Sequence, residues 1–179
     1  VEGAGKKRDF AYDAAVDKVD KILQDNKPSE FNLVIFSAAG GSGSVLGPLL
    51  ASELLKRDAA TLCIVVGSTL SHKECHNTIA TLRTLQGLCK NSTNGHSITM
   101  AYFENSTSNA PGQSHVLERP DVDLRIEEVI RQTGLLVGGS HHGLDAADLR
   151  NWLGFSKHTG IPAQLTEALV FRQGEDGIR

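Results

Sequence analysis

The stretch that decides the fold runs from Phe31 to Leu50 and reads FNLVIFSAAGGSGSVLGPLL. It opens with a short, continuous apolar run, Leu33–Phe36, which is typical of a parallel strand that is covered on both faces. Glycines follow at three positions of the next turn, Gly40, Gly41 and Gly43. From about Ser44 onward, apolar residues at helical spacing predict an amphipathic helix: Leu46, Leu49, Leu50 and Leu54.

The glycine-rich turn coincides with the predicted start of this helix. Glycine has no side chain, so the backbone can turn tightly there and approach a ligand closely. The first amides of a helix lack intrahelical carbonyl partners, and the helix dipole places positive charge at the same end. We therefore expect the turn to hold an anion such as a phosphate group.

Three common glycine-rich motifs fit this turn poorly. The dinucleotide-binding pattern G-x-G-x-x-G, counted from Gly41, would place Leu46 at its last glycine. The Walker loop needs a lysine, and the stretch contains none. The nucleophile elbow G-x-S-x-G lacks only its last glycine here. A serine hydrolase that uses Ser42 or Ser44, with a histidine such as His141, therefore stays open as an alternative.

The segment Ala39–Val45, AGGSGSV, resembles the phosphate loop of the tubulin/FtsZ superfamily, whose signature is G-G-G-T/S-G-S/T-G. Ala39 and Val45 stand at two of its glycine positions, and Ser42 stands at the usual threonine. The longer string GGSGSVLGPLL is most similar to the phage tubulins of the PhuZ type, which very large bacteriophages encode. The resemblance implies that backbone amides of this loop bind GTP phosphates without a lysine. The residues implied are Ala39, Gly40, Gly41, Ser42, Gly43 and Ser44.

Strand and helix patterns alternate along the rest of the chain. Besides the helix that starts near residue 44, the predicted helices cover residues 10–24, 75–89 and 120–137. Besides residues 33–36, the predicted strands cover residues 61–67, 97–104 and 163–171. Repeated β-α-β units with short links predict an α/β fold, in which a parallel sheet carries helices on both faces. Ligands of such sheets lie beyond the carboxyl ends of the strands.

Composition excludes several classes of function. The chain has 179 residues, of which 40% are apolar, and a net charge of −3. No long block of like charges indicates nucleic-acid binding, and no run of about 18 apolar residues indicates a membrane span. Cys63, Cys75 and Cys89 are odd in number and lack C-x-x-C spacing. We interpret them as reduced structural thiols and expect no metal-ligating residues.

Four further sites in the sequence resemble nucleotide contacts of the family or are candidates for one. Gly3-Ala4-Gly5 matches the loop that faces the terminal phosphate, although a frayed chain end is an equally good interpretation. Asn105 follows a predicted strand, where the family has an asparagine that binds guanine; an amide offers a donor and an acceptor, but a turn asparagine is the commoner case. Asp123 matches a base-contacting position, and complementing the helix dipole is an equally good role. Glu74 is a candidate for the family's ribose-contacting acid.

The second informative stretch is GGSHHGLDAADL, residues 138–149. It resembles the catalytic loop of the family, N-x-D-x-x-D, with Gly143 in place of the asparagine. The resemblance implies catalytic roles for Asp145 and Asp148. Their spacing is also that of a simple cap before the apolar helix that carries Trp152, and this alternative stays open.

The resemblance also implies a domain organisation. Residues 1–159 would form a tubulin-like nucleotide-binding domain whose N-terminal part is missing, with residues 120–137 as its central helix. Residues 160–179 would begin a second domain. The chain opens with Val1 rather than Met, directly in a segment that resembles an internal loop. We therefore expect a fragment of a longer protein.

For the complete protein, the resemblance implies a GTPase that assembles with itself, head to tail, into filaments. In the family, the catalytic loop of one subunit caps the nucleotide of the next, so GTP hydrolysis, assisted by Mg²⁺, occurs at the subunit interface. Phage tubulins form a spindle that positions phage DNA in the cytoplasm of the host bacterium, without direct nucleic-acid or membrane contact. A non-hydrolysing structural protein of this fold is the alternative. We expect the isolated 179 residues to bind GTP weakly and not to polymerise.

Overall fold

A parallel sheet forms the centre of the chain in the computed structural model, which describes residues 5, 7–92, 97–105, 119–138 and 145–168. Within these residues, four strands pair in sequence order, and every pair is parallel. The strands are β1 (Phe31–Ser37), β2 (Ala60–Gly67), β3 (Ile98–Glu104) and β4 (Leu165–Glu167). The predicted fold class is therefore confirmed.

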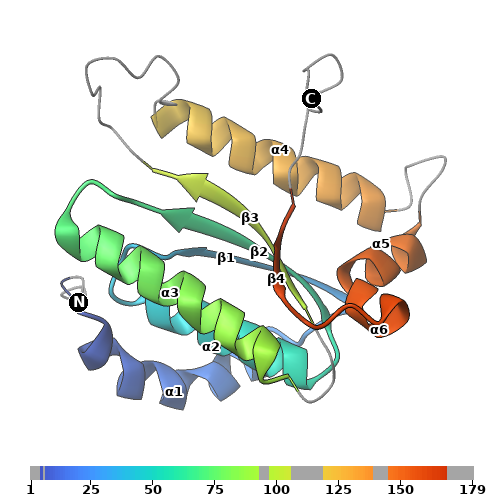
Figure 1. The fold of residues 1–179 in the computed structure, drawn as a ribbon, viewed down its shortest axis with the longest axis horizontal. Helices are drawn as coiled ribbons and strands as arrows, with labels where there is room; N and C mark the ends of the chain where they lie inside the picture. Colours follow the sequence, from blue (N-terminus) through green and yellow to red (C-terminus); the bar gives the residue numbers. More distant parts are fainter. Residues whose placement is uncertain (1–4, 6, 93–96, 106–118, 139–144, 169–179) are drawn as a thin grey trace.

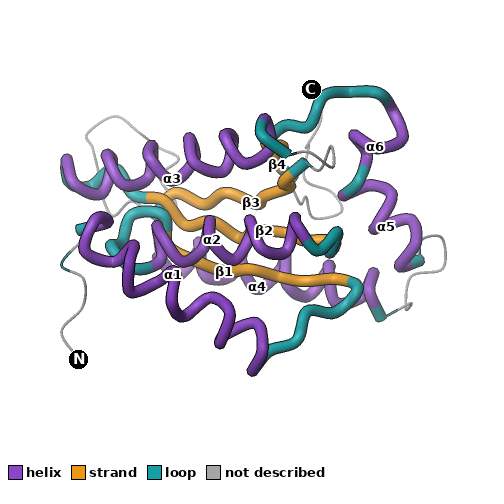
Figure 2. The backbone as a smooth tube through the Cα atoms, turned by 90° about the horizontal axis from the view of Figure 1, so that it is seen from below, coloured by secondary structure: helices purple, strands orange, loops and turns teal. Residues whose placement is uncertain are grey.

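Helices cover both faces of the sheet (Figures 1 and 2). On one face lie α1 (Arg8–Asp25), α2 (Gly43–Lys56) and α3 (His72–Lys90). The opposite face carries α4 (Arg119–Val137). Two short helices, α5 (Ala146–Leu153) and α6 (Phe155–Thr159), lie at the end of the sheet where the strands begin. No helix in the described ranges is both long and apolar enough to cross a membrane.

The residues of β2 show why its sequence is apolar without interruption from Leu62 to Val66. Cys63 and Val65 are buried in the core that the sheet forms with α1, α2 and α3. Leu62 and Ile64 point to the other face and are buried in the core that includes α4. Since successive side chains of a strand alternate between faces, a strand covered on both sides has no polar position.

The buried face of α2 differs from the predicted leucine stripe. Leu54 is buried as expected, but the residues that lie closest to the sheet are small: Gly47, Pro48 and Ala51. A Cβ atom added at Gly47 would lie 2.3 Å from the ring of Phe36. The Phe36 ring of β1 therefore takes the space that a leucine of α2 would fill. The remaining leucines of the stripe are partly buried at the edge of this core: Leu46, Leu49 and Leu50.

Element boundaries differ modestly from the predicted ones. Helix α1 begins at Arg8, two residues earlier than predicted, and α6 follows α5 after a break at Gly154 that the sequence pattern did not indicate. Strand β4 begins at Leu165, two residues later than predicted. The end of that predicted strand, at residues 169–171, lies outside the described ranges.

Gly47→Ala should destabilise the chain, because its methyl group would need the Phe36 ring to move. Overpacking of this kind costs about 1–3 kcal/mol. Gly87→Ala in α3 is the matched control, since a Cβ atom there would meet nothing within 4 Å. Its better helix propensity should stabilise the chain by up to about 1 kcal/mol. Urea unfolding gives both free energies, and equal stability of the two variants would contradict the packing described here.

Candidate functional site

The glycine-rich turn lies at the carboxyl end of β1, directly before α2. Ser42 occupies the N-cap position of α2, but its backbone is already helical, with φ −76° and ψ −49°, and its side chain makes no capping hydrogen bond. The helix therefore begins without the side-chain acceptor that usually covers its first amides.

Three carbonyl groups of this turn accept from buried side chains, whereas its amides have no partner in the described part of the chain. The Asn77 side chain approaches the Ala39 carbonyl, and the Thr81 hydroxyl approaches the Ala38 carbonyl. The Ser44 hydroxyl donates to the Gly41 carbonyl at 3.0 Å. In contrast, the backbone N–H groups of residues 40–44 donate to no group of the described chain. A row of unpaired donors at a helix N-terminus is an anion-binding arrangement.

Two polar residues of α3 hold the turn in place. The Asn77 side chain donates to the Ala39 carbonyl at 3.1 Å, and the Thr81 hydroxyl lies 3.3 Å from the Ala38 carbonyl. Both side chains are buried, Asn77 at 4% exposure and Thr81 at 0%. Our sequence analysis did not single them out. The available signal was two polar residues on the inward face of an otherwise apolar helix stripe, in register with Leu85.

Gly43 is the glycine of the turn that packing requires. A Cβ atom there would lie 2.6 Å from the carbonyl oxygen of Ser37, which is backbone and has no rotamer to change. At Gly40 the nearest atom would be the Ser37 hydroxyl at 3.8 Å, an ordinary contact. The close approach of α2 to the end of β1 therefore depends on Gly43.

The two serines of the turn do not form the activated nucleophile of a hydrolase. Ser44 is fully buried, and its hydroxyl already donates to the Gly41 carbonyl. Ser42 is exposed, and its hydroxyl contacts no histidine in the described part of the chain. His141 lies outside the described residues. The geometry described gives the serine-hydrolase alternative no support.

Asn105 lies at the same edge of the sheet, immediately after β3. Its backbone amide donates to the Gly67 carbonyl at 2.9 Å, which fixes it beside the end of β2. Its side-chain oxygen Oδ1 is buried and accepts no hydrogen bond from any described residue. Buried polar atoms are almost always paired, so this oxygen is available to a donor of a bound ligand, as a guanine-binding role would require.

A second polar cluster lies beside Asn105, and our sequence analysis missed it. The Tyr102 hydroxyl donates to Glu104 at 2.6 Å, and the Thr69 hydroxyl donates to the other oxygen of that carboxylate at 2.8 Å. Burial and the bond to Glu104 raise the pKa of Tyr102, so the phenol stays protonated. A Cβ atom at Gly67 would lie 2.1 Å from the Tyr102 oxygen, so this arrangement needs glycine there.

Glu74, the candidate for ribose contact, lies in the first turn of α3. Its carboxylate accepts from the hydroxyls of Ser71 at 3.1 Å and Ser68 at 3.3 Å. Its own amide donates to the Ser71 hydroxyl, the N-cap of α3. The described contacts thus hold the Glu74 carboxylate on two serine hydroxyls near the end of β2, and its ribose contact stays a prediction.

The other predicted contacts are only partly within the described residues. Asp123 is exposed in α4, whose first turns lie at the carboxyl end of the sheet (Figure 1). Gly5 is exposed, with a positive φ of 54° that suits glycine. Gly3 and Ala4 lie outside the described residues. Base contact by Asp123 and phosphate contact by residues 3–5 stay predictions.

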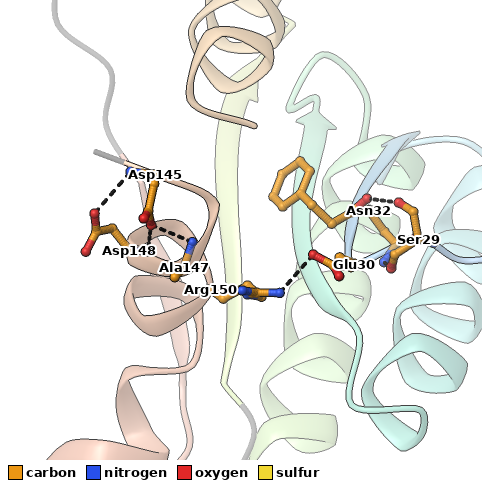
Figure 3. A network of polar contacts seen from close by, with 8 residues as sticks. Ser29, Glu30, Asn32, Asp145, Ala147, Asp148 and Arg150 are labelled. Atoms are coloured by element: carbon orange, nitrogen blue, oxygen red, sulfur yellow. Dashed lines mark hydrogen bonds and ion pairs between the residues drawn. The ribbon is translucent and has the colours of Figure 1, made fainter. Parts of the chain in front are cut away.

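Asp145 and Asp148 form a capping box at the start of α5 (Figure 3). The Asp145 carboxylate accepts from the amides of Ala147 at 2.8 Å and Asp148 at 3.0 Å. The Asp148 carboxylate accepts in return from the Asp145 amide at 3.0 Å. Both side chains are exposed. The capping alternative is therefore what the structure contains, and an additional catalytic role stays a prediction.

This capping box lies at the opposite end of the sheet from the glycine-rich turn. From the same helix, Arg150 forms an ion pair of 2.8 Å with Glu30, which directly precedes β1 (Figure 3). A cleft of about 770 Å³ separates α5 and α6 from the first residues of the strands. The domain thus carries its unpaired amides at one end and its exposed aspartates at the other.

Known proteins share both the sequence pattern and the fold. The chain is 32% identical over 166 residues to a phage tubulin-like protein of Pseudomonas phage 201phi2-1, and 30% identical over 166 residues to one of Pseudomonas phage PhiPA3. These alignments cover 92% of this chain and 50% of each relative. A structure of the phage tubulin PhuZ with GDP superposes with a TM-score of 0.82 at 32% identity, covering 98% of this chain and 53% of that one.

The chain is therefore similar in sequence and fold to phage tubulin-like proteins. A filament of PhuZ201 gives a similar result, with a TM-score of 0.81 and 30% identity over 95% of this chain and 52% of that chain. No family model matches the sequence. The chain spans about half the length of the curated relatives it matches. The resemblance to phage tubulins predicted from the glycine-rich turn is thus confirmed.

Asp145→Ala should lower the free energy of unfolding by about 0.5–2 kcal/mol, because it removes the acceptor for two amides of α5. Asp145→Asn should stay close to the parent, since an asparagine oxygen is an equally good cap. Thermal melting of both variants tests this assignment. Equal destabilisation by Ala and Asn would mean that the charge of the carboxylate, rather than the cap, stabilises α5.

Proposed function

We propose that this phage tubulin-like protein binds GTP and GDP at the glycine-rich turn, hydrolyses GTP and assembles with itself into filaments. One observation carries the proposal: the amides of residues 40–44 have no partner among the described residues, in a fold shared with the PhuZ structure that contains GDP. Those amides would hold the phosphate groups, as unpaired donors at a helix N-terminus do.

The neighbouring strand ends supply the rest of the proposed nucleotide site. Asn105 would accept from the guanine edge through its buried, unpaired Oδ1, and Asp123 would contribute a base contact from α4. The described residues contain no cluster of three or more metal-ligating side chains. We therefore expect phosphate oxygens and water to supply most ligands of Mg²⁺, as is usual for this ion.

Hydrolysis would occur between subunits. The unpaired amides and the Asp145–Asp148 pair lie at opposite ends of the domain, so one subunit would bring its aspartates to the nucleotide of the next only in a head-to-tail arrangement. A filament of PhuZ201 and a protofilament of TubZ from bacteriophage PhiKZ, at 28% identity, support such assembly. Self-association is thus part of the proposed site.

The chemical step proposed at this interface is the attack of water on the terminal phosphate of GTP. Phosphoryl transfer to water needs positioning and charge stabilisation rather than a covalent intermediate. Each aspartate uses a single oxygen in the capping box, which leaves its second oxygen exposed to a partner. That second oxygen would orient the attacking water, while the cap holds the carboxylate in place.

The cellular role follows from the family. We propose that the filaments form a spindle that positions phage DNA in the cytoplasm of the host bacterium. The net charge of −3 agrees with a protein that does not bind DNA directly. A non-hydrolysing structural filament is the second candidate, because both aspartates already have a capping role and Gly143 replaces the asparagine of the catalytic loop.

Gly43→Ala in the protein expressed from its complete reading frame should raise the Kd for fluorescently labelled GDP at least about tenfold, because the new methyl group would displace the turn from Ser37. Gly40→Ala is the matched control and should bind with nearly the parent Kd, since its methyl group makes an ordinary contact. Fluorescence titration measures both. Parent affinity in Gly43→Ala would contradict the assignment of the phosphate site.

Asp148→Asn separates hydrolysis from capping. The amide oxygen still accepts from the Asp145 amide, so the melting temperature should stay at the parent value. Loss of the carboxylate should slow phosphate release within filaments by a factor on the order of a hundred, while GTP binding and light scattering by filaments persist. Parent rates of phosphate release in Asp148→Asn filaments would favour the structural-filament candidate or a different catalytic group.

A further inference from the structure

Arg8, the first residue of α1, reaches across to the helix that holds the glycine-rich turn. Its Nη1 atom donates to the Thr81 hydroxyl at 2.7 Å and to the Asn77 carbonyl at 3.2 Å. Its Nη2 atom makes a longer contact of 3.5 Å with the exposed Thr84 hydroxyl. The short contact is thus directed at the residue that lies against the turn, 73 positions away in sequence.

This guanidinium is partly buried, and it has no carboxylate partner among the residues that the structure describes. Burial lowers the pKa of Arg8 despite the nearby charge of Asp9, and its hydrogen bonds all go to neutral oxygens. Removing a cation from water without a counter-charge is unfavourable. An anion bound at the adjacent turn would offset that cost.

Thr81 connects Arg8 to both ends of the turn. Its hydroxyl lies 3.3 Å from the Ala38 carbonyl before the turn and 3.3 Å from the Ser44 carbonyl after it. Ser44 needs this donor, because the residue four positions later is Pro48, which has no N–H group to continue the helix pattern.

The Thr81 hydroxyl has one proton and three carbonyls within reach. The third is the Asn77 carbonyl of its own helix, at 2.7 Å. Arg8 also donates to that carbonyl, while its donation to the Thr81 oxygen leaves the hydroxyl proton for another acceptor. Arg8 thereby favours a hydrogen bond from Thr81 to the turn over one within α3.

We propose that Arg8 is a positioning residue for the nucleotide phosphates, acting through Thr81 to hold the glycine-rich turn and adding positive charge beside a turn that contains none. This inference rests on the proposed function, because it assigns a role to Arg8 at the same site. It explains how a phosphate loop without lysine receives a cation from α1, through the contacts of Arg8 with α3.

The test measures the Kd for fluorescently labelled GDP in the protein expressed from its complete reading frame. Arg8→Gln and Thr81→Val should each raise the Kd about tenfold, as expected for losing one buried or charge-assisted hydrogen bond. Thr81→Ser keeps the hydroxyl and should stay within about threefold of the parent. Thr84→Val, which removes the exposed contact of Arg8 and an exposed hydroxyl bond to the Ala80 carbonyl within α3, is the matched control and should bind like the parent.

A double variant tests whether Arg8 acts through Thr81. Arg8→Gln combined with Thr81→Val should weaken GDP binding by clearly less than the product of the two single effects, because Thr81→Val removes the group through which Arg8 holds the turn. Full additivity of the two effects would overturn the proposed connection. All titrations are made well below the melting temperature of each variant, so a purely structural role would lower that temperature and leave the Kd unchanged.

The outcomes separate this inference from the proposed function. If the parent binds no guanine nucleotide, both fall together. If the parent binds and Gly43→Ala does not, while Arg8→Gln and Thr81→Val keep the parent Kd, this inference alone is overturned. Arg8 lies partly at the surface, so Arg8→Gln decides the matter even where Thr81→Val does not fold.

Discussion

The structure of the site depends on a difference between the carbonyls and the amides of one turn: the carbonyls are paired with side chains, and the amides are not. In the turn between β1 and α2, the carbonyls accept from buried side chains, while the amides of residues 40–44 have no partner within the described ranges. A backbone donor without a partner is unfavourable in a folded protein unless water or a ligand pairs with it. The protein tolerates this row of donors because α3 and the close approach at Gly43 hold the turn from behind.

The same layered architecture gives the domain two different ends. Parallel strands place all their carboxyl ends at one edge, where the glycine-rich turn meets Asn105 and the Tyr102–Glu104 cluster. The helices after α4 return to the other edge, where Arg150 pairs with Glu30 and the aspartates of the capping box face solvent (Figure 3). Two unlike ends suit head-to-tail assembly, since one end carries the amides of the glycine-rich turn and the other carries the exposed aspartates.

The sequence predicted the features that depend on local pattern. Continuous apolar runs identified the strands, and the coincidence of three glycines with a helix start identified the turn. The expectation that β1 is covered on both faces was wrong, because Ile35 is 50% exposed. The leucine stripe of α2 was a less accurate guide, because the Phe36 ring from another element decides which face of that helix is buried. Periodicity describes one helix, whereas burial also depends on the shape of its neighbour.

Side chains that act over long sequence distances could not be predicted in this way. Thr81 lies 43 positions from the carbonyl it approaches and Asn77 lies 38, so only the folded β-α-β topology brings them to the turn. Arg8 is a terminal basic residue in the sequence, and its contact with Thr81 depends on how α1 packs beside α2 and α3. Asp145 and Asp148 had the spacing of a cap, and that local pattern did form.

The central claim is that the unpaired amides of the glycine-rich turn bind nucleotide phosphates. Backbone amide NMR, with GDP titrated into ¹⁵N-labelled protein, tests this claim most directly. The account predicts that the largest shifts, in the direction expected for new hydrogen bonds, and the slowest hydrogen exchange occur at Gly41, Ser42, Gly43 and Ser44. Saturable binding of GDP that leaves these four amides unshifted and unprotected would contradict it.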